Sequence, residues 1–337
     1  MTLRVGISGF GLAGRYFHAP LLVSTGFELV GAVTKNEERI AHLREDYPGA
    51  KAVSTIDDLL ELGLDLLVVA SANTAHASDA IAGVRAGVPV VVDKPMGRTL
   101  AETQEIVDIS TATGVPVTTY FNRLWDSDAL TIKKILADGV IGKAFRLESR
   151  FERFRPEPNP TAWRERSSSL DGGGNLLDLQ PHLISTALDW FGPAELTYAS
   201  VRSIRGYADD DVVLTLKHES GVDSYLAASA IIGAPGPRIR LSGDEGSLII
   251  NDLDPQESFL RAGKRPVDGR WSEDTRSGAK IYRGDEIIEC ESVPGNYALF
   301  YHHVREAILG KGDWPVSTSS AIAVATIIDQ ARALTIR

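Results

Sequence analysis

The sequence has little cysteine, no excess of positive charge and no long apolar run. Its single cysteine, Cys290, cannot form an internal disulfide, which fits a reducing cytoplasm. No apolar segment approaches the roughly 18–20 residues that a membrane helix needs, so we predict no membrane association. The N-terminal residues lead into an apolar stretch that ends in glycines, and not into a signal-peptide cleavage site.

Positive charge is outnumbered, because 35 Lys and Arg residues stand against 45 Asp and Glu residues, for a formal net charge of −10. Non-specific binding of nucleic acid needs a basic surface that displaces counterions, so this balance argues against a nucleic-acid partner. The 337 residues are 43% hydrophobic and 24% charged, which is ordinary for a globular protein and excludes wholesale disorder. At roughly 150 residues per domain, this length predicts about two domains.

The first part of the chain alternates short apolar runs with longer amphipathic segments. The strand-like runs are Leu3–Ser8, Phe27–Val33, Leu66–Ser71, Val88–Asp93 and Val115–Phe121. The helix-like segments between them are Arg15–Ser24, Glu37–Tyr47, Ile56–Leu62, His76–Ala86 and Leu100–Thr113. Continuous apolar strands alternating with helices predict an α/β domain over residues 1–121, with a doubly wound parallel sheet.

After about residue 122 the pattern changes to β-rich segments with few helices. The strand-like segments are Phe145–Phe154, Leu196–Ser203, Val212–His218, Ser224–Ala230, Arg238–Ser242 and Ser247–Ile250. Helices are predicted at Ala129–Asp138, Leu176–Phe191 and Ala321–Leu334. Residues 122–337 are therefore expected to form an α+β domain with a large, mostly antiparallel sheet. The spacing leaves open whether the last helix returns to cover the first domain.

A glycine loop, Gly9-Phe10-Gly11-Leu12-Ala13-Gly14, follows the first predicted strand and opens the first predicted helix. A G-x-G-x-x-G is a weak signal by itself, but this is the position that a dinucleotide-binding loop occupies. Gly9 would make the tight turn, Gly11 would let the backbone approach a pyrophosphate, and Gly14 would allow close helix–strand packing. Amides at the start of the helix would then bind the phosphates.

The end of the second predicted strand distinguishes the two nicotinamide dinucleotides. NAD usually needs an acidic side chain there to accept hydrogen bonds from the ribose 2′-hydroxyl. Here Thr34 and Lys35 supply a hydroxyl and a cation, and Arg39 follows in the next helix. These residues favour a 2′-phosphate, and therefore NADP, while Glu37 leaves NAD open. Alternatively, Lys35 and Arg39 are simply solvated charges at a helix start.

Two further motifs contain residues that can handle protons. Lys94 follows the fifth predicted strand, at the edge where ligands of open α/β sheets bind, and its ammonium could polarise a substrate oxygen. Asp178 and His182 follow the run Gly172–Gly174, and one helix would place them four apart on one face, with the carboxylate orienting a general base. Taken alone, such a lysine or such a pair is more often an ordinary surface feature.

Together these motifs resemble those of the Gfo/Idh/MocA family of glucose–fructose oxidoreductases, inositol dehydrogenases and their relatives. The resemblance extends over nearly the whole chain. Within the family, it is greatest to NADP-dependent dehydrogenases of the scyllo-inositol type. The segments that carry this subgroup match are Gly11–Gly14, Phe17–Pro20, Asn122–Asp126 and Arg261–Pro266.

The resemblance implies a Rossmann domain followed by an open-faced sheet that forms homodimers or homotetramers. It implies hydride transfer between the nicotinamide and a hydroxyl-bearing carbon of a cyclitol, sugar or polyol. By motif, Lys94 would bind the reacting oxygen, His182 would carry its proton and Asp178 would orient the site. Other residues implied at the cofactor are Ser71, Asn73, His76, Asn122, Trp163 and Arg164, in addition to Lys94. Arg123 and Tyr297 are further substrate candidates, and Tyr297 could equally be a core residue.

Four residues depart from the family pattern. Asp93 replaces Glu before the lysine, Ala72 replaces Pro, Gln180 replaces Gly, and Ser185 replaces Asp. None removes a proton-handling group, but Gln180 is expected to crowd or reshape the substrate pocket, which leaves the substrate open. The alternatives are an NADPH-dependent reductase of other carbonyl or diol compounds and a non-catalytic, dinucleotide-sensing regulator. No ligand-like cluster predicts a metal site.

Overall fold

The computed structural model describes residues 2–159, 161–267, 270–276 and 278–335, which form two compact units. Unit 1 contains Met1–Tyr120, Gln256–Trp271 and Tyr297–Ile322. Unit 2 contains Phe121–Pro255, Ser272–Asn296 and Ala323–Arg337. The chain thus passes into unit 2 after Tyr120, next to the predicted boundary, but later returns twice to unit 1.

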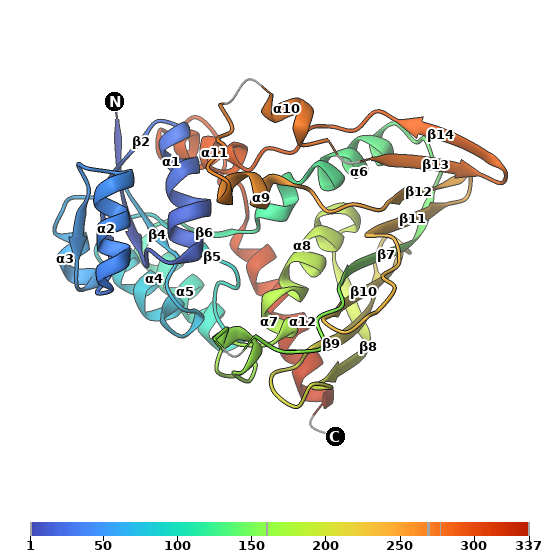
Figure 1. Cartoon of the computed structure of the whole chain (residues 1–337), viewed down its shortest axis with the longest axis horizontal. Helices are drawn as coiled ribbons and strands as arrows, with labels where there is room; N and C mark the ends of the chain where they lie inside the picture. Colours follow the sequence, from blue (N-terminus) through green and yellow to red (C-terminus); the bar gives the residue numbers. More distant parts are fainter. Residues whose placement is uncertain (1, 160, 268–269, 277, 336–337) are drawn as a thin grey trace. The chain divides into compact units, whose positions relative to one another are not determined.

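Unit 1 is built on a six-stranded parallel sheet in the order β3-β2-β1-β4-β5-β6 (Figure 1). The strands are β1 (Leu3–Ser8), β2 (Phe27–Val33), β3 (Lys51–Val53), β4 (Leu66–Val69), β5 (Val90–Asp93) and β6 (Val117–Tyr120). This order is that of a dinucleotide-binding Rossmann fold, so the predicted doubly wound sheet is confirmed. Only β3 was not predicted, because an edge strand of one exposed and two partly buried residues has no apolar run.

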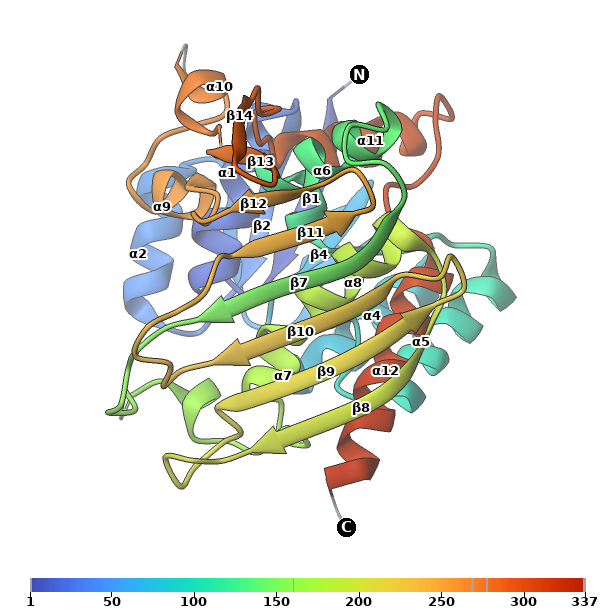
Figure 2. The ribbon, with the colours of Figure 1, turned by 90° about the vertical axis from the view of Figure 1, so that its right-hand side faces the viewer.

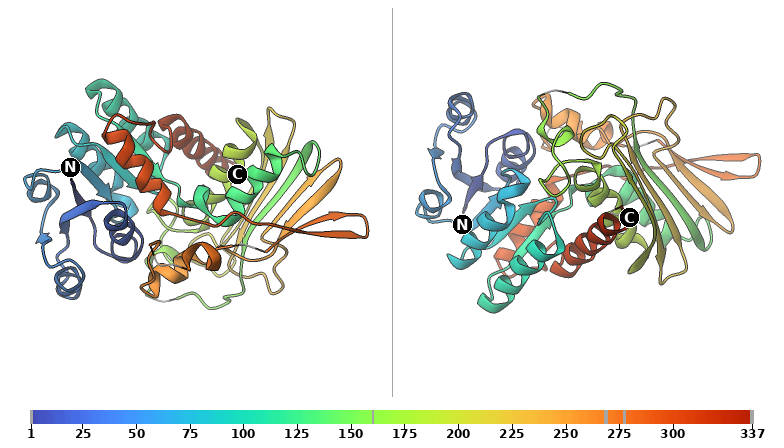
Figure 3. Two further views of the ribbon diagram at one scale, coloured as in Figure 1. Left: turned by 90° about the horizontal axis from the view of Figure 1, so that it is seen from above. Right: turned by 90° about the horizontal axis from the view of Figure 1, so that it is seen from below.

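Helices cover both faces of this sheet, as Figure 3 shows around the blue and cyan strands. The helices of unit 1 include η1 (Ala13–His18), α1 (Ala19–Ser24), α2 (Glu37–Asp46), α3 (Ile56–Leu60), η2 (Asn73–Ala75), α4 (His76–Arg85), α5 (Leu100–Thr113), α9 (Gln256–Arg261) and α11 (Ala298–Ile308). The helix α5 has its predicted bounds, because Thr99 accepts a hydrogen bond from the amide of Glu102 and Gly114 ends the helix in the left-handed region.

Unit 2 is built on an eight-stranded sheet in the order β14-β13-β12-β11-β7-β10-β9-β8, seen face-on in Figure 2. The strands are β7 (Ala144–Glu152), β8 (Ala194–Arg202), β9 (Asp211–His218), β10 (Asp223–Ser229), β11 (Ile239–Gly243), β12 (Gly246–Ile250), β13 (Ala279–Arg283) and β14 (Glu286–Cys290). All neighbours are antiparallel except β7 and β10, which confirms the predicted mostly antiparallel sheet.

Helices lie on one face of this sheet, and in Figure 2 no described helix crosses its other face over β7, β9 and β10. The remaining helices are η3 (Asn122–Trp125), α6 (Ser127–Ala137), η4 (Trp163–Glu165), α7 (Asn175–Asp178), α8 (Gln180–Phe191), α10 (Trp271–Asp274) and α12 (Thr318–Thr335). The last of these, α12, begins in unit 1 and continues in unit 2. None of the described helices is both long and apolar enough to span a membrane.

The single helix predicted over Leu176–Phe191 is wrong, because the structure divides it into α7 and α8 at Leu179. Pro181 explains the division. It has no amide hydrogen to continue α7, and its ring would collide with the carbonyl four residues earlier. In the first turn of a new helix the same residue is well tolerated.

Candidate functional site

The glycine loop after β1 is shaped by close contacts within unit 1. Gly9 has φ +93°, and a Cβ there would lie 2.7 Å from the carbonyl oxygen of Ala70. A Cβ on Gly14 would lie 2.1 Å from the carbonyl oxygen of Gly9. A Cβ on Gly11 would meet nothing closer than the Arg39 guanidinium at 3.6 Å. Gly9 and Gly14 are therefore needed by the loop itself, while Gly11 leaves a cradle that fits a pyrophosphate.

The other loop residues differ in exposure. Phe10 is buried and packs edge-on against Tyr47, with ring centroids 6.4 Å apart, so only its backbone can face a ligand. Leu12 is 42% exposed and precedes η1, which is a π-helix. Ala13 opens η1, and the Arg15 amide donates to the Gly11 carbonyl at 2.9 Å. A π-helical turn at this point is typical of functional sites.

The end of β2 brings cations beside this loop. Thr34 is buried, and its hydroxyl accepts a hydrogen bond from the amide of Asn36 at 3.4 Å. Asn36 in turn caps α2 by accepting from the amide of Arg39 at 3.0 Å. Lys35 and Arg39 are exposed, and Arg39 reaches toward Gly11 as described above. An anionic group at the loop would therefore meet a guanidinium, as a 2′-phosphate requires.

Lys94 directly follows β5, at the same edge of the sheet as the glycine loop, because parallel strands end at one edge. Its amide donates to Asp93 Oδ1 at 2.8 Å, and Asp93 Oδ2 lies 3.7 Å from Nε2 of the buried His18. Burial raises the pKa of Asp93, but His18, Lys94 and His76 together outweigh it and lower the pKa to about 2. An ionised carboxylate therefore stands directly before Lys94.

His76 braces the turn after Lys94. Its Nδ1 lies 2.8 Å from the carbonyl oxygen of Pro95, and its Nε2 lies 3.2 Å from that of Ser71. Burial lowers the pKa of His76. The Ser71 hydroxyl donates to Asp79 at 3.0 Å, and Asn73 is buried at the start of η2. The ring of His76, predicted at the cofactor, thus links the ends of β4 and β5.

In unit 2 the glycine run forms the entry to α7. A Cβ on Gly173 would lie 2.2 Å from the carbonyl oxygen of Ser167, and one on Gly174 would lie 1.9 Å from Asp209 Oδ1. Gly174 also has φ +81°. The glycines therefore allow a close approach to the protein's own atoms.

Asp209 was not predicted as a site residue. Its Oδ2 accepts a hydrogen bond from the amide of Leu176 at 2.7 Å, at the start of α7. Burial raises the pKa of Asp209 to about 6, against the opposing effect of the Leu176 amide. Only the three consecutive aspartates 209–211 marked this position in the sequence, and acidic runs are usually solvated.

Asp178 and His182 lie on different helices, so the prediction that they share one helix face is wrong. Asp178 ends α7, and its Oδ1 lies 3.8 Å from Arg164 Nε in a partly exposed ion pair. His182 lies in the first turn of α8 and is buried, with its ring edge-on to Phe151 at 6.1 Å. The two ends of the Asp-Leu-Gln-Pro-His motif thus belong to different helices.

Gln180, between them, points at the sheet. It is fully buried, and its Nε2 donates to the carbonyl oxygens of Val212 on β9 and Leu226 on β10, at 3.2 and 3.4 Å. The expectation that its side chain crowds a substrate pocket is therefore wrong. Ser185, another departure from the family pattern, donates to the His182 carbonyl within α8 at 3.1 Å.

Asn175 makes the same kind of contact one step along the sheet. Its Nδ2 donates to the carbonyl oxygens of Asp210 and Ala228, at 2.9 and 3.5 Å. Asp210, just before β9, and Ala228 on β10 are each two residues from an acceptor of Gln180. Two neutral amides thus fasten α7 and the start of α8 to the same pair of strands.

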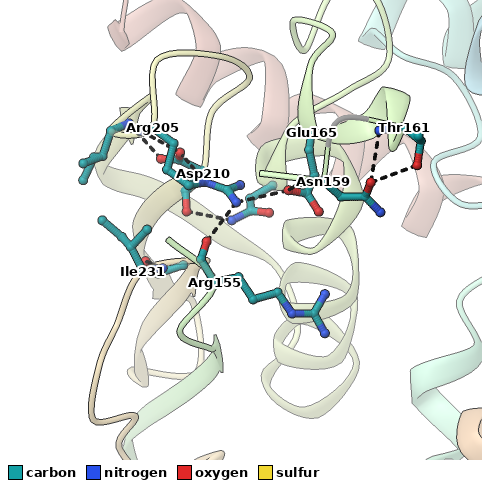
Figure 4. A network of polar contacts seen from close by, with 10 residues as sticks. Arg155, Asn159, Thr161, Glu165, Arg205, Asp210 and Ile231 are labelled. Carbon is teal, nitrogen blue, oxygen red and sulfur yellow. Dashed lines mark hydrogen bonds and ion pairs between the residues drawn. The ribbon is translucent and has the colours of Figure 1, made fainter. Parts of the chain in front are cut away.

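Arg205 holds the segment that contains Trp163 and Arg164 (Figure 4). Its Nη1 donates to Glu165 Oε2 and to the carbonyl oxygen of Arg155, both at 3.1 Å, and its Nε donates to Asp210 at 2.9 Å. The side chain of Trp163 lies outside the described part of the structure. Sequence reasoning missed Arg205, because two of these three partners are 40 and 50 residues away.

The remaining candidates are buried within their own units. Arg123, in unit 2, pairs with Asp126 at 3.1 Å and places its guanidinium 5.5 Å from the ring centre of Phe151. Its neighbour Asn122 is also buried. Tyr297, in unit 1, is fully buried and its amide donates to Gln256 Oε1 at 2.7 Å, which favours the core interpretation of the two. In the described residues, no group of three His, Cys, Asp or Glu side chains could hold a metal ion.

Comparison with known proteins identifies two matching family models. Residues 3–121 match the model of the oxidoreductase family with an NAD-binding Rossmann fold. Residues 129–249 match the model of the Gfo/Idh/MocA C-terminal domain. The two matched ranges correspond to the parallel-sheet region and to most of the region that forms the larger sheet.

Individual relatives match over nearly their whole length. The chain is 34% identical to the uncharacterized oxidoreductase YdgJ of Escherichia coli, over 97% of this chain and 95% of that protein. It is 32% identical to the scyllo-inositol 2-dehydrogenase (NADP(+)) IolW of Bacillus subtilis, over 98% of this chain and 93% of that protein. The solved structure of the oxidoreductase yvaA of Bacillus subtilis matches with a TM-score of 0.89 and 30% identity, covering 99% and 96% of the two chains.

Proposed function

The chain belongs to the Gfo/Idh/MocA oxidoreductase family, and from this premise we propose that it is an NADP-dependent dehydrogenase or reductase of a cyclitol, sugar or polyol. One observation carries the proposal. The end of β5 presents Lys94 at the same edge of the parallel sheet as the open cradle at Gly11. A cation that can bind a substrate oxygen therefore shares an edge with a loop that fits a dinucleotide.

The preference for NADP is supported by the cations at the end of β2. Arg39 lies beside Gly11, Lys35 is exposed next to it, and no acidic residue stands at the tip of the strand. The relative IolW carries NADP(+) in its name. When bound, the dinucleotide supplies or accepts a hydride at its nicotinamide ring.

The chain's own residues supply the proton chemistry. The Lys94 ammonium binds the reacting oxygen and stabilises the negative charge that develops there as the proton leaves. The His182 imidazole accepts that proton in the oxidative direction and returns it in the reductive direction. Asp178 orients the site. These roles follow from the family motif, and each side chain has the chemical groups that its role requires.

We further propose that the face of the eight-stranded sheet that Figure 2 presents packs against a second copy of the chain in a homodimer or homotetramer. Tyr225 on β10 is 40% exposed, and it is paired with Glu148 on β7 and Thr215 on β9. The Arg146 guanidinium lies 6.0 Å from the Tyr225 ring centre. Tyrosine and arginine are enriched in protein interfaces. The free thiol of Cys290 supports a cytoplasmic location.

A spectrophotometric screen tests the proposed reaction. Purified protein is incubated with NADP or NAD and with inositols, sugars, diols or the corresponding carbonyl compounds, and nicotinamide absorbance is followed. We expect turnover with a polyol, and at least about tenfold tighter binding of NADP than of NAD, measured by calorimetry. Tighter binding of NAD would overturn the cofactor assignment. Tight dinucleotide binding with no turnover on the whole panel would favour the regulator, and turnover only on diols would favour the alternative reductase.

A further inference from the structure

A buried histidine and a buried tyrosine stand behind Asp93, and the reaction proposed above uses neither. His18 ends η1, and Tyr301 lies in α11, in the segment that returns to unit 1. Both side chains are fully buried. His18 Nδ1 lies 2.5 Å from the Tyr301 hydroxyl, and His18 Nε2 lies 3.7 Å from Asp93 Oδ2. The three side chains thus form a row that ends one residue before Lys94.

The Tyr301 hydroxyl orients the imidazole. Burial, together with Tyr120 and Asp93, raises the pKa of Tyr301 well above its ordinary value, so the hydroxyl keeps its proton and can donate it. In a neutral imidazole one nitrogen accepts and the other donates. When Nδ1 accepts from Tyr301, Nε2 carries the hydrogen and directs it at Asp93. A protonated imidazole also directs an N–H at Asp93, so both states favour the carboxylate.

Asp93 connects this row to Lys94. Its Oδ1 accepts the backbone N–H of Lys94, and its Oδ2 faces His18. The titratable and charged groups that act on Asp93 are His18 from η1, His76 from α4 and the adjoining Lys94. Asp79 of α4 acts on His76, and the Tyr120 ring of β6 lies 4.7 Å from the ring of His18. Because burial disfavours an ionised Asp93, the carboxylate depends on these neighbours.

We propose that His18, oriented by Tyr301, is a positioning residue for Lys94, because it holds the Asp93 carboxylate against the backbone of Lys94. The inference rests on the proposed function only in that Lys94 is taken to be catalytic. His18 and Tyr301 touch neither the substrate nor the cofactor in this account. Their effect on the reaction passes through the position and ionisation of Asp93 alone.

Three variants test this chain of contacts. His18→Asn withdraws the donor from Asp93, His18→Gln keeps a neutral donor near the position of Nε2, and Tyr301→Phe removes only the orienting hydroxyl. For His18→Asn we expect kcat to fall about tenfold, because the variant removes the imidazole that lies 3.7 Å from Asp93 Oδ2 and helps to keep this carboxylate ionised beside Lys94. The affinity of His18→Asn for NADP should not change. The kcat of His18→Gln should be higher than that of His18→Asn. The kcat of Tyr301→Phe should lie between those of His18→Asn and the unmodified protein.

The titration of Asp93 can also be measured directly, without any substrate turnover. The ¹³Cγ resonance of Asp93, assigned by comparison with Asp93→Asn, is titrated down to the lowest pH at which the protein stays folded. We expect it to begin titrating at a higher pH in His18→Asn and in Tyr301→Phe than in the unmodified protein. If His18→Asn does not fold, Tyr301→Phe decides the question. An unchanged titration and an unchanged kcat in the folded variants would overturn the inference.

The variant Lys94→Ala distinguishes the catalytic role of Lys94 from the positioning role of His18. If it keeps full turnover, the catalytic assignment of the lysine is wrong, whatever His18 does. If it is inactive while the folded His18 and Tyr301 variants behave like the unmodified protein, only the positioning role fails.

Discussion

The surroundings of Lys94 in unit 1 and of His182 in unit 2 are held together by different interactions. Asp93, before Lys94, lies among titratable groups such as His18 and His76. The helix that carries His182 is fastened to its sheet by the neutral amide of Gln180. A position held by charge depends on pH, whereas one held by neutral amides does not. The two parts of the proposed site should therefore respond differently to acid.

The two unusual carboxyl groups of these regions sharpen the contrast. Asp93 is largely buried, yet three basic neighbours lower its pKa to about 2. Asp209, beside α7, is also mostly buried, but no comparable set of cations offsets burial and its pKa is raised to about 6. Burial alone therefore does not decide the ionisation state of a carboxyl group. The ionisation state also depends on the charges that the fold brings close to it.

The largest expected effect comes from removing either proposed catalytic group. Lys94→Ala and His182→Asn should each lower kcat by about 10³-fold, because each removes a group that acts on the reacting oxygen or its proton. Steady-state rates on the substrate found in the screen measure this, with the midpoint of urea unfolding as the control for folding. If one variant alone is impaired, the two regions do not serve one reaction.

Next in size is a pair of glycine changes in unit 1. In Gly14→Ala the new Cβ would lie 2.1 Å from a backbone oxygen, so we expect a loss of about 1–3 kcal/mol in the free energy of unfolding. Gly11→Ala meets only the Arg39 side chain, at 3.6 Å, and should keep its stability but bind NADP more weakly. Urea unfolding and calorimetry separate the two effects. Equal NADP affinity in Gly11→Ala and the unmodified protein would exclude the loop as the phosphate site.

The two carboxyl groups should have opposite effects on stability at neutral pH. The folded pKa of Asp93 lies below the unfolded value of about 3.9, so its contribution is present above about pH 4 and is lost as pH falls toward 2. The folded pKa of Asp209, about 6, lies above the unfolded value, so stability is lost as pH rises from about 4 through 6.

At pH 8 we therefore expect Asp93→Asn to unfold more easily and Asp209→Asn less easily, each by about 1–2 kcal/mol. The new amide oxygen at position 209 can still accept the Leu176 N–H. Urea unfolding at pH 5 and pH 8 measures both variants. If both variants changed the free energy of unfolding in the same direction at pH 8, the proposed contrast between Asp93 and Asp209 would be wrong.

The smallest effect should come from Gln180→Met, which keeps the volume of the side chain and removes the amide. We expect a loss of about 1 kcal/mol in the free energy of unfolding and a fall in kcat of about tenfold or less. The titration of the Asp93 ¹³Cγ resonance should stay unchanged, in contrast to His18→Asn. A shifted Asp93 titration in Gln180→Met would show that the two regions do not depend on separate interactions.

Much of unit 1 could be predicted from the sequence, because its signals are local. Continuous apolar runs mark β1, β2, β4, β5 and β6, and Thr99 and Gly114 mark the ends of α5. The family resemblance drawn from the motifs is confirmed, as is the class of oxidoreductase. The NADP preference, the substrate, the oligomer and the roles of the individual site residues stay predictions.

Unit 2 was harder to predict in detail. The hairpin β13–β14 was missed, because most of its residues are at least partly exposed and give no continuous apolar run. Pro181 marked the break between α7 and α8, but the four-residue spacing of Asp178 and His182 favoured one helix. The spacing predicted a helix that the missing amide hydrogen of proline does not allow.

The sequence by itself determined the parallel sheet, the position of the glycine loop and the residue types at the proposed site, since these depend on neighbours in the chain. Only the tertiary structure decided what those residues touch. His18 meets Tyr301 across 283 positions of the chain, and Gln180 finds its acceptors 32 and 46 residues away. Such contacts leave no periodic signal, because they depend on which strands and helices pack together and on the charges that packing brings within reach.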